Sequence, residues 1–341
     1  MNSFYPITLY LWDYIFSIID KNEIKILRIV CKDFRNISTN YWFQNIPDEE
    51  VNNYFINIQK FNFNIRFIIL QNEKFDFEKF DFKKLNNNEL LFLSCENGYL
   101  EIVNLLVKNC KNINQKNKYE VTPLIYASCK GYLKIAKLLV KNGANINFKD
   151  NCGNTPLIYA CKYGHLELVK LLFKKGANIN EKDNDNTSVL IYACLYKQLK
   201  IIKFLIKIGA DINQTDNKRN NVLIYASKYG YLEIIKLLIK NNVNINEKNN
   251  IGNTALLYAS DNGYLEIVEI LIKNGSNINV KNNNGWTPLM NASWRGHKKI
   301  VKLLIKNGAN INEKSDSKKN ALQLAKENNQ LEIIKYLENF I

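Results

Sequence analysis

The chain has 341 residues, of which 46% are hydrophobic and about 55 are asparagine, and its net charge is +15. This length exceeds one ordinary globular core, and the seven scattered cysteines, which form no CxxC pair, argue against a disulfide-stapled secreted domain and favour the reducing cytoplasm. No uncharged apolar run approaches the roughly 18 residues of a membrane span, and the first residues lack the basic start of a signal peptide.

The first segment, residues 5–37, has the pattern of a bundle of short helices. Apolar residues recur there at helical spacing, and Asp20, Lys21 and Asn22 mark a turn between two helices. So short a segment hardly buries a self-sufficient core. We therefore expect it to dock on a partner, or else to act only as a helical cap that shields the segment after it.

The end of this bundle reads Val30-Cys31-Lys32-Asp33-Phe34, after spaced Leu and Ile residues and an early proline. In this pattern residues 1–45 resemble the F-box. The resemblance implies docking on the small adaptor subunit of a cullin–RING ubiquitin ligase. It places the following residues at that interface: Pro6, Leu11, Ile15, Leu27, Val30, Cys31 and Phe34.

Residues 46–86 are rich in phenylalanine, with Phe61, Phe63, Phe75 and Phe77 among them, and are too apolar for a free linker. We expect a partly helical connector that caps the N-terminal face of the following array.

After the connector, a short phrase of the type Gly-Tyr-Leu-Glu-Ile-Val returns every 33 residues. Its eight copies start at Gly98, Gly131, Gly164, Lys197, Gly230, Gly263, Gly296 and Asn329. A fixed period near 33 is typical of a stack of small helical units, none of which buries its apolar face alone. The period predicts an extended surface for binding other macromolecules.

Within one unit, Thr122-Pro123 starts a short helix and Gly131 ends it, because Thr caps free amides and Gly accepts the left-handed conformation. A second amphipathic helix and a turn-rich segment follow. The pieces TPLIYA (122–127 and 155–160), TPLMNA (287–292) and GANIN (143–147) resemble the ankyrin repeat. The resemblance implies an all-α solenoid of eight units over residues 87–341, each a helix pair with a short hairpin finger.

The middle of the array departs from this pattern. Ser188 and Asn221 replace the Thr of Thr-Pro, Lys197 replaces a Gly between helices, and Arg219 stands where a finger Gly belongs. An arginine there is costly if the backbone needs a positive φ. We expect residues 186–222 to be the least regular part of the stack.

The ankyrin resemblance also implies a target-binding groove at the residues before each inter-helix Gly and at finger tips. Tyr, Trp and Arg are the residues that dominate binding hot spots. The predicted groove residues are Lys130, Lys162, Tyr163, Leu195, Tyr196, Lys228, Tyr229, Trp286, Trp294 and Arg295. A second tyrosine column, at 126, 159, 192, 225 and 258, is interpreted as core packing, and some groove aromatics could equally pack between repeats.

The sequence contains no phosphate-binding, zinc-protease or nucleophile-elbow motif, and its two histidines, His165 and His297, lie far apart. We therefore expect no enzyme, no metal and no cofactor. The preferred interpretation is a cytoplasmic substrate-recruiting subunit of a cullin–RING ubiquitin ligase, similar to F-box/ankyrin proteins of large DNA viruses and intracellular bacteria. The alternatives are an ankyrin scaffold or inhibitor without ligase contact, and an anion- or nucleic-acid-binding module, since the whole +15 charge lies in residues 89–341.

Overall fold

The computed structural model describes residues 87–341 except 109, 111 and 341, which belong to one compact unit, residues 81–341. The predicted F-box-like segment (1–45), with all seven of its proposed interface residues, and the connector (46–86) lie outside the described residues. The described part is all-α, with sixteen α-helices in consecutive pairs and no strand. The first helices of the pairs are α5 (Asn87–Asn97), α7 (Pro123–Lys130), α9 (Pro156–Tyr163), α11 (Val189–Leu195), α13 (Val222–Lys228), α15 (Ala255–Asn262), α17 (Pro288–Arg295) and α19 (Ala321–Glu327).

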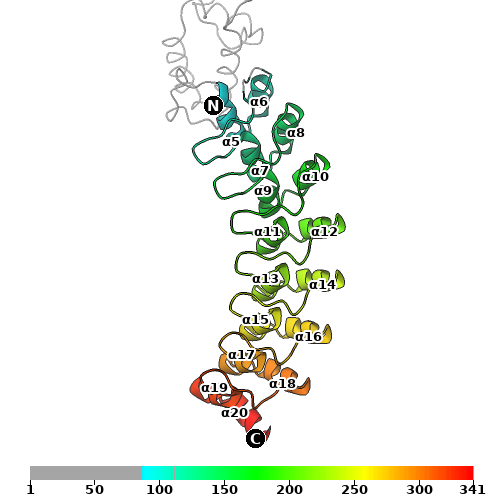
Figure 1. The fold of residues 1–341 in the computed structure, drawn as a ribbon. Helices are drawn as coiled ribbons and strands as arrows, with labels where there is room; N and C mark the ends of the chain where they lie inside the picture. The colour runs from blue at the N-terminus through cyan, green and yellow to red at the C-terminus, as the bar shows by residue number, and fades with distance from the viewer. Residues whose placement is uncertain (1–86, 109, 111, 341) are drawn as a thin grey trace, which may run out of the picture. The chain divides into compact units, whose positions relative to one another are not determined.

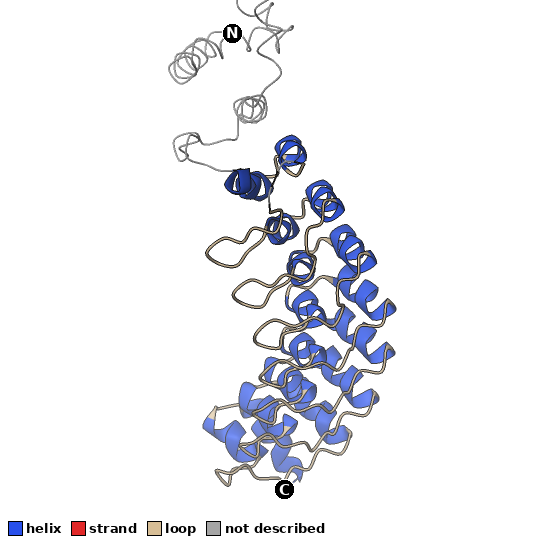
Figure 2. Cartoon of the chain, turned by 45° about the horizontal axis from the view of Figure 1, so that its top comes forward, coloured by secondary structure: helices blue, strands red, loops and turns tan. Residues whose placement is uncertain are grey.

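Each first helix is followed by an antiparallel second helix, and the pairs stack in single file (Figure 1). The loops between pairs project to one side as fingers, which Figure 2 shows as a row of tan loops. This arrangement confirms the expected solenoid of helix pairs. The second helices are α6 (Leu100–Leu106), α8 (Leu133–Lys141), α10 (Leu166–Lys174), α12 (Leu199–Lys207), α14 (Leu232–Lys240), α16 (Leu265–Lys273), α18 (Lys298–Lys306) and α20 (Leu331–Leu337), followed by the 3₁₀ turn η4 (Glu338–Phe340).

From α7 onward, each first helix begins where a side-chain oxygen accepts a hydrogen bond from the third helical amide. The Thr122 hydroxyl accepts from the Ile125 amide at 3.3 Å, and Asn221 Oδ1 accepts from the Ile224 amide at 2.9 Å. Ser188 caps α11 in the same way. The substitutions in the middle of the array therefore preserve the cap, because Ser and Asn are as good N-cap residues as Thr.

The core is a pair of buried columns that continue from repeat to repeat. In α8 the buried residues are Ile135, Ala136 and Leu139, and the same three positions are buried in every second helix from α6 to α18. Each first helix packs on the first helices of the neighbouring pairs and on its own second helix. No pair thus has a core of its own, as expected for a stacked array.

The glycines between the two helices allow close packing of successive repeats. Gly131 has φ 76°, and a Cβ built on it would lie 2.4 Å from the His165 ring of the next repeat. Lys197 occupies the same position with φ 56°. Its ammonium lies 5.5 Å from the Tyr231 ring centroid, a cation–π contact that offsets part of the backbone strain.

Asparagine side chains join the fingers of adjacent repeats. The backbone amide of Asn244 donates to Asn213 Oδ1 at 2.8 Å, and that of Asn277 donates to Asn246 Oδ1 at 2.9 Å, one repeat further on. Asn246 Nδ2 also donates to the Gly275 carbonyl at 3.0 Å. The richness in asparagine thus has a structural use in the described repeats.

The stack continues without a break through residues 186–222. Here α11 and α13 have seven residues each, as does α19, and the only isolated bridges among the described residues, Lys182 with Ser188 and Thr215 with Asn221, precede α11 and α13. That this is the least regular part of the stack stays a prediction. Arg219 has φ 58° and donates to Glu247 at 3.0 Å. The period itself is preserved because the buried positions are unchanged.

Candidate binding surface

Nine of the ten predicted groove residues lie at the C-terminal ends of α7, α9, α11, α13 and α17 or directly after them, and Trp286 lies in the finger before α17. Lys130 ends α7, Lys162 and Tyr163 end α9, and Lys228 ends α13. Because these helices stack side by side, the residues form a row along the array. We call the part contributed by α7, α9, α11 and α13 the tyrosine–lysine row; its members are Lys130, Lys162, Tyr163, Leu195, Tyr196, Lys228 and Tyr229.

Lys162 lies among three tyrosine rings. Its Nζ is 5.4 Å from the ring centroid of Tyr163 and 5.3 Å from that of Tyr196, and 5.8 Å from that of Tyr192. Burial opposes the charged form of Lys162, but the contacts with Tyr196 and Tyr163 outweigh it and raise the pKa of the ammonium. This lysine is therefore a fixed positive charge held by aromatic faces.

A second cluster repeats this arrangement two repeats further along. Lys228 Nζ lies 5.7 Å from the Tyr229 ring centroid and 5.8 Å from that of Tyr258. The Tyr229 ring stacks on Tyr225, with centroids 6.4 Å apart. The exposed fractions of Tyr163, Tyr196 and Tyr229 are 43%, 45% and 43%, so three large aromatic side chains face solvent at the same position of consecutive repeats.

The second tyrosine column is not a core column, and this interpretation was wrong. Its members are half-buried, and their hydroxyls bond to the fingers. The hydroxyls of Tyr159 and Tyr192 donate to Asp150 and Asp183 at 2.7 and 2.6 Å. Burial and then this bond to a carboxylate raise the pKa of both phenols. The rings are thereby held at the edge of the tyrosine–lysine row, and Tyr192 and Tyr258 contribute faces to Lys162 and Lys228.

The sequence does contain a pattern that could have identified this column. An Asp or Asn stands nine residues before each tyrosine, at 117, 150, 183, 216 and 249. Pairing these two columns requires knowing that the finger folds back beside its own first helix.

Charge divides the candidate surface into two parts. Among the described residues, Lys130, Lys162 and Lys228 take part in no ion pair. Arg295, by contrast, binds Asp261 through Nε at 2.8 Å and through a second nitrogen at 3.3 Å. Near it Trp286 and Trp294 contact each other edge to face, with centroids 5.9 Å apart. The C-terminal residues of the predicted groove thus contact each other, while the tyrosine–lysine row has unneutralised positive charge.

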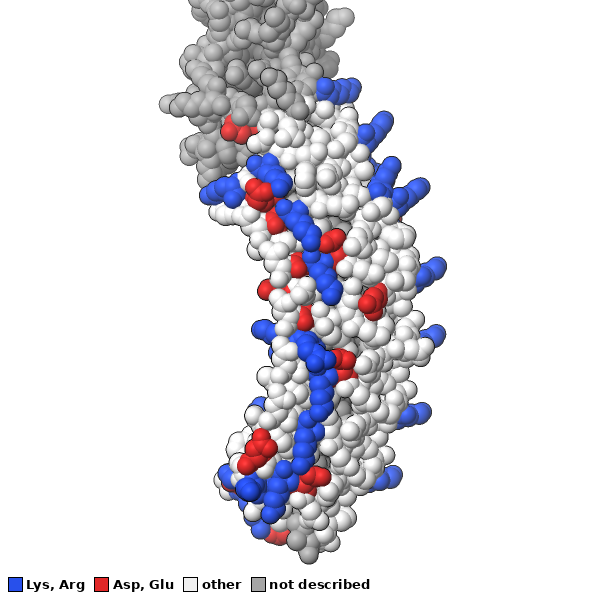
Figure 3. Space-filling model, in the orientation of Figure 1, with Lys and Arg blue, Asp and Glu red and all other residues white. Residues whose placement is uncertain are grey.

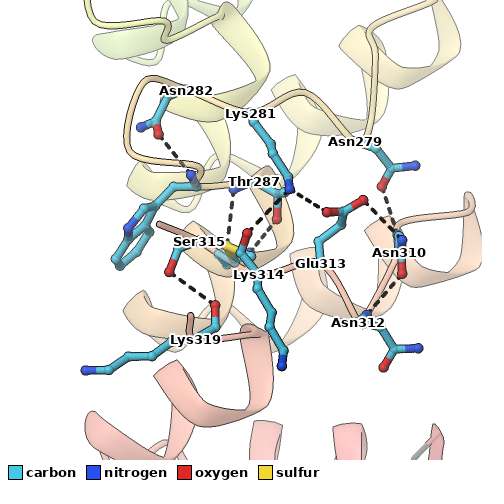
Figure 4. A network of polar contacts seen from close by, with 12 residues as sticks. Asn279, Lys281, Asn282, Thr287, Asn310, Asn312, Glu313, Lys314, Ser315 and Lys319 are labelled. Atoms are coloured by element: carbon cyan, nitrogen blue, oxygen red, sulfur yellow. Dashed lines mark hydrogen bonds and ion pairs between the residues drawn. The ribbon is translucent and has the colours of Figure 1, made fainter. Parts of the chain in front are cut away.

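A different set of lysines joins repeats. Figure 3 shows Lys and Arg side chains in a line along the stack, with Asp and Glu beside them. At positions 33 residues apart, Lys248 Nζ donates to the Lys281 carbonyl at 2.9 Å, and Lys281 Nζ donates to the Lys314 carbonyl at 3.4 Å. Lys281 also pairs with Glu313 at 2.6 Å (Figure 4). Part of the basic charge of the array is therefore engaged in holding repeats together.

The two histidines make structural contacts with backbone carbonyls. Nε2 of His165 lies 3.1 Å from the Cys129 carbonyl, and Nε2 of His297 lies 3.0 Å from the Asp261 carbonyl. No group of three His, Cys, Asp or Glu residues in the described part of the chain is arranged to hold a metal ion. A shallow hollow between α6 and α8, lined by Leu100, Leu138 and three lysines, lies away from the tyrosine–lysine row. None of the described helices combines the length and apolarity that crossing a membrane requires.

Comparison with known proteins gives one match. The family model described as "Ankyrin repeats (3 copies)" matches residues 59–150, 142–216, 208–282 and 274–339, which together make up more than half of the chain. No curated protein matches the chain. The first match begins at residue 59, before the first described helix, so the count of eight repeats stays a prediction.

Proposed function

This chain belongs to the ankyrin-repeat family, whose repeats are protein–protein interaction modules, and we propose that its tyrosine–lysine row is where a target protein binds. One observation supports this place above others: Tyr163, Tyr196 and Tyr229 are exposed at one position of three consecutive repeats, beside lysines without acidic partners in the described residues. Tyrosine is enriched at binding hot spots because it buries a large area at low entropic cost.

The test is recovery of partners by the full chain. Tyr163→Ala with Tyr196→Ala should reduce recovery of the bound proteins by about tenfold or more, because hot-spot truncations cost about 2 kcal/mol or more each. The matched control is Leu331→Ala, since Leu331 is 68% exposed on α20, at the far end of the array. Circular dichroism should show all variants folded. Unchanged recovery by the double variant would place the binding surface elsewhere.

We further propose that residues 5–37 attach the bound target to a cullin–RING ubiquitin ligase, in the cytoplasm. The support is the sequence: the Val30-Cys31-Lys32-Asp33-Phe34 element after helically spaced apolar residues resembles an F-box. In this role no residue of the chain is catalytic. The chain would act by proximity, raising the effective concentration of target lysines beside the charged conjugating enzyme.

Binding of the purified adaptor subunit tests this second proposal independently. Wild-type chain should retain the adaptor, and Val30→Asp with Phe34→Ala should lose it, because a charge and a cavity would disrupt an apolar interface. The Tyr163→Ala/Tyr196→Ala variant should retain the adaptor fully. If wild-type chain retains no adaptor, the ligase role is wrong and the chain is a scaffold or inhibitor.

A further inference from the structure

We infer that the target presents an extended acidic segment to the tyrosine–lysine row, with carboxylates spaced to match the repeats. The inference rests on the proposed function and specifies its partner chemistry. In the inferred register, one acidic residue lies opposite Lys162, an apolar residue opposite Leu195, and a second acidic residue opposite Lys228.

Acidic side chains in the fingers beside the row already have hydrogen-bond partners, whereas two lysines of the row lack acidic ones. The carboxylates of Asp150, Asp183 and Asp216 each accept a tyrosine hydroxyl and a backbone amide of their own finger. Lys162 and Lys228 have rings beside them but no carboxylate partner among the described residues. A partner that supplies carboxylates therefore completes the row electrostatically.

The aromatic contacts make these lysines favourable partners. A free lysine side chain loses rotamer entropy when it is fixed in an ion pair, which is why exposed pairs contribute little. Lys162 is already held among the rings of Tyr163, Tyr192 and Tyr196 before any ligand arrives. Its side chain therefore loses less rotamer entropy on binding. Pairing with a carboxylate should for this reason add more affinity than it would at an ordinary surface lysine.

Leu195 gives the register its apolar position. At the position of Lys162 and Lys228, the repeat between them has Leu195, which is half-buried beside the exposed Tyr196. The lysine that follows it, Lys197, has its ammonium over Tyr231. At this position α7 has Cys129, whereas Lys130 stands at the position of Tyr163, so the column from α9 to α13 reads basic, apolar, basic.

The spacing follows from the stack. Packed helices lie about 8–10 Å apart, and an extended chain rises about 3.3 Å per residue. One repeat thus corresponds to about three residues of an extended peptide. The inferred segment therefore has the form acidic-x-x-apolar-x-x-acidic, where x is any residue.

The test is selection from a displayed library of random ten-residue peptides on the full chain. We expect enrichment of acidic residues at two positions six residues apart, with an apolar residue midway between them. The peptide so selected should bind Lys162→Glu about tenfold more weakly than wild type. Lys203→Glu, the same charge change at an exposed position on α12, is the control and should bind normally. Replacing one of the two acids of the peptide by lysine should restore binding to Lys162→Glu.

Three outcomes would overturn the inference: no enriched sequence, enrichment without an acidic preference, or equal binding of a peptide with the same residues in shuffled order. Failure here is distinguishable from failure of the proposed function. If Tyr163→Ala/Tyr196→Ala loses its protein partners while no acidic peptide is selected, the row still binds the target but not through this chemistry.

Discussion

Replacing Leu205 by alanine is expected to lower the free energy of unfolding by about 2–5 kcal/mol. Leu205 is fully buried in α12, which packs on α11 and on the second helices of both neighbouring repeats, α10 and α14. The substitution removes apolar area and leaves a cavity that a close-packed stack fills only partly. Since each repeat contacts only its neighbours, weakening this central repeat also weakens the coupling between the two ends of the array.

Chemical denaturation followed by circular dichroism measures this loss. Lys203→Ala is the matched control, because Lys203 is exposed on the same helix, and it should change the free energy of unfolding by no more than about 0.5 kcal/mol. Equal midpoints for the two variants would mean that α12 is not part of the cooperative core. A broader transition for Leu205→Ala alone would indicate that the ends unfold separately.

Most of the fold is predictable from the sequence because its determinants are local and repeated. Thr122 and Gly131 mark the ends of α7, and the structure places a cap and a left-handed residue at those positions. Ile135 and Leu139 belong to the stripe that is buried. The same cap recurs in each first helix from α7 to α19, so one unit interpreted correctly predicts most features of its neighbours.

Where the sequence departs from the repeat, local rules are insufficient. Arg219 has the positive φ that a glycine would prefer, but it also binds Glu247 of the next finger. Lys197 has a positive φ and contacts Tyr231. Both compensating contacts join residues about 30 positions apart, and only the stacking of repeats brings them together.

The sequence predicts where the candidate surface lies, but it does not predict all the residues that form it. The row from Lys130 to Tyr229 follows from the ankyrin resemblance, whereas the contribution of Tyr192 and Tyr258 does not. Their position one residue before a buried alanine suggests core packing. The bond from the Tyr192 hydroxyl to Asp183 instead holds the ring at the edge of the row, a geometry that depends on how the finger folds back.

Asp216→Ala is expected to lower the free energy of unfolding by about 2–4 kcal/mol, because hydrogen bonds to a charged group contribute about 1.5–3 kcal/mol and its partners would be left unpaired. Asp216 is 8% exposed. It accepts from the backbone amides of Lys218 and Asn220 at 2.9 and 2.8 Å, and from the Tyr225 hydroxyl at 2.5 Å. One carboxylate thus accepts hydrogen bonds both within the finger and from a side chain of α13. Thermal or urea denaturation measures the loss.

The chain supplies its own control for this prediction, Asp216→Asn. Asn249 stands at the same position of the next repeat, where its Oδ1 accepts from the Ile251 and Asn253 amides at 3.2 and 2.8 Å and its Nδ2 contacts the Tyr258 hydroxyl at 3.2 Å. An amide therefore satisfies the same partners, and Asp216→Asn should cost less than about 1 kcal/mol. If Asn proves as damaging as Ala, the negative charge, rather than the hydrogen-bond pattern, stabilises this finger.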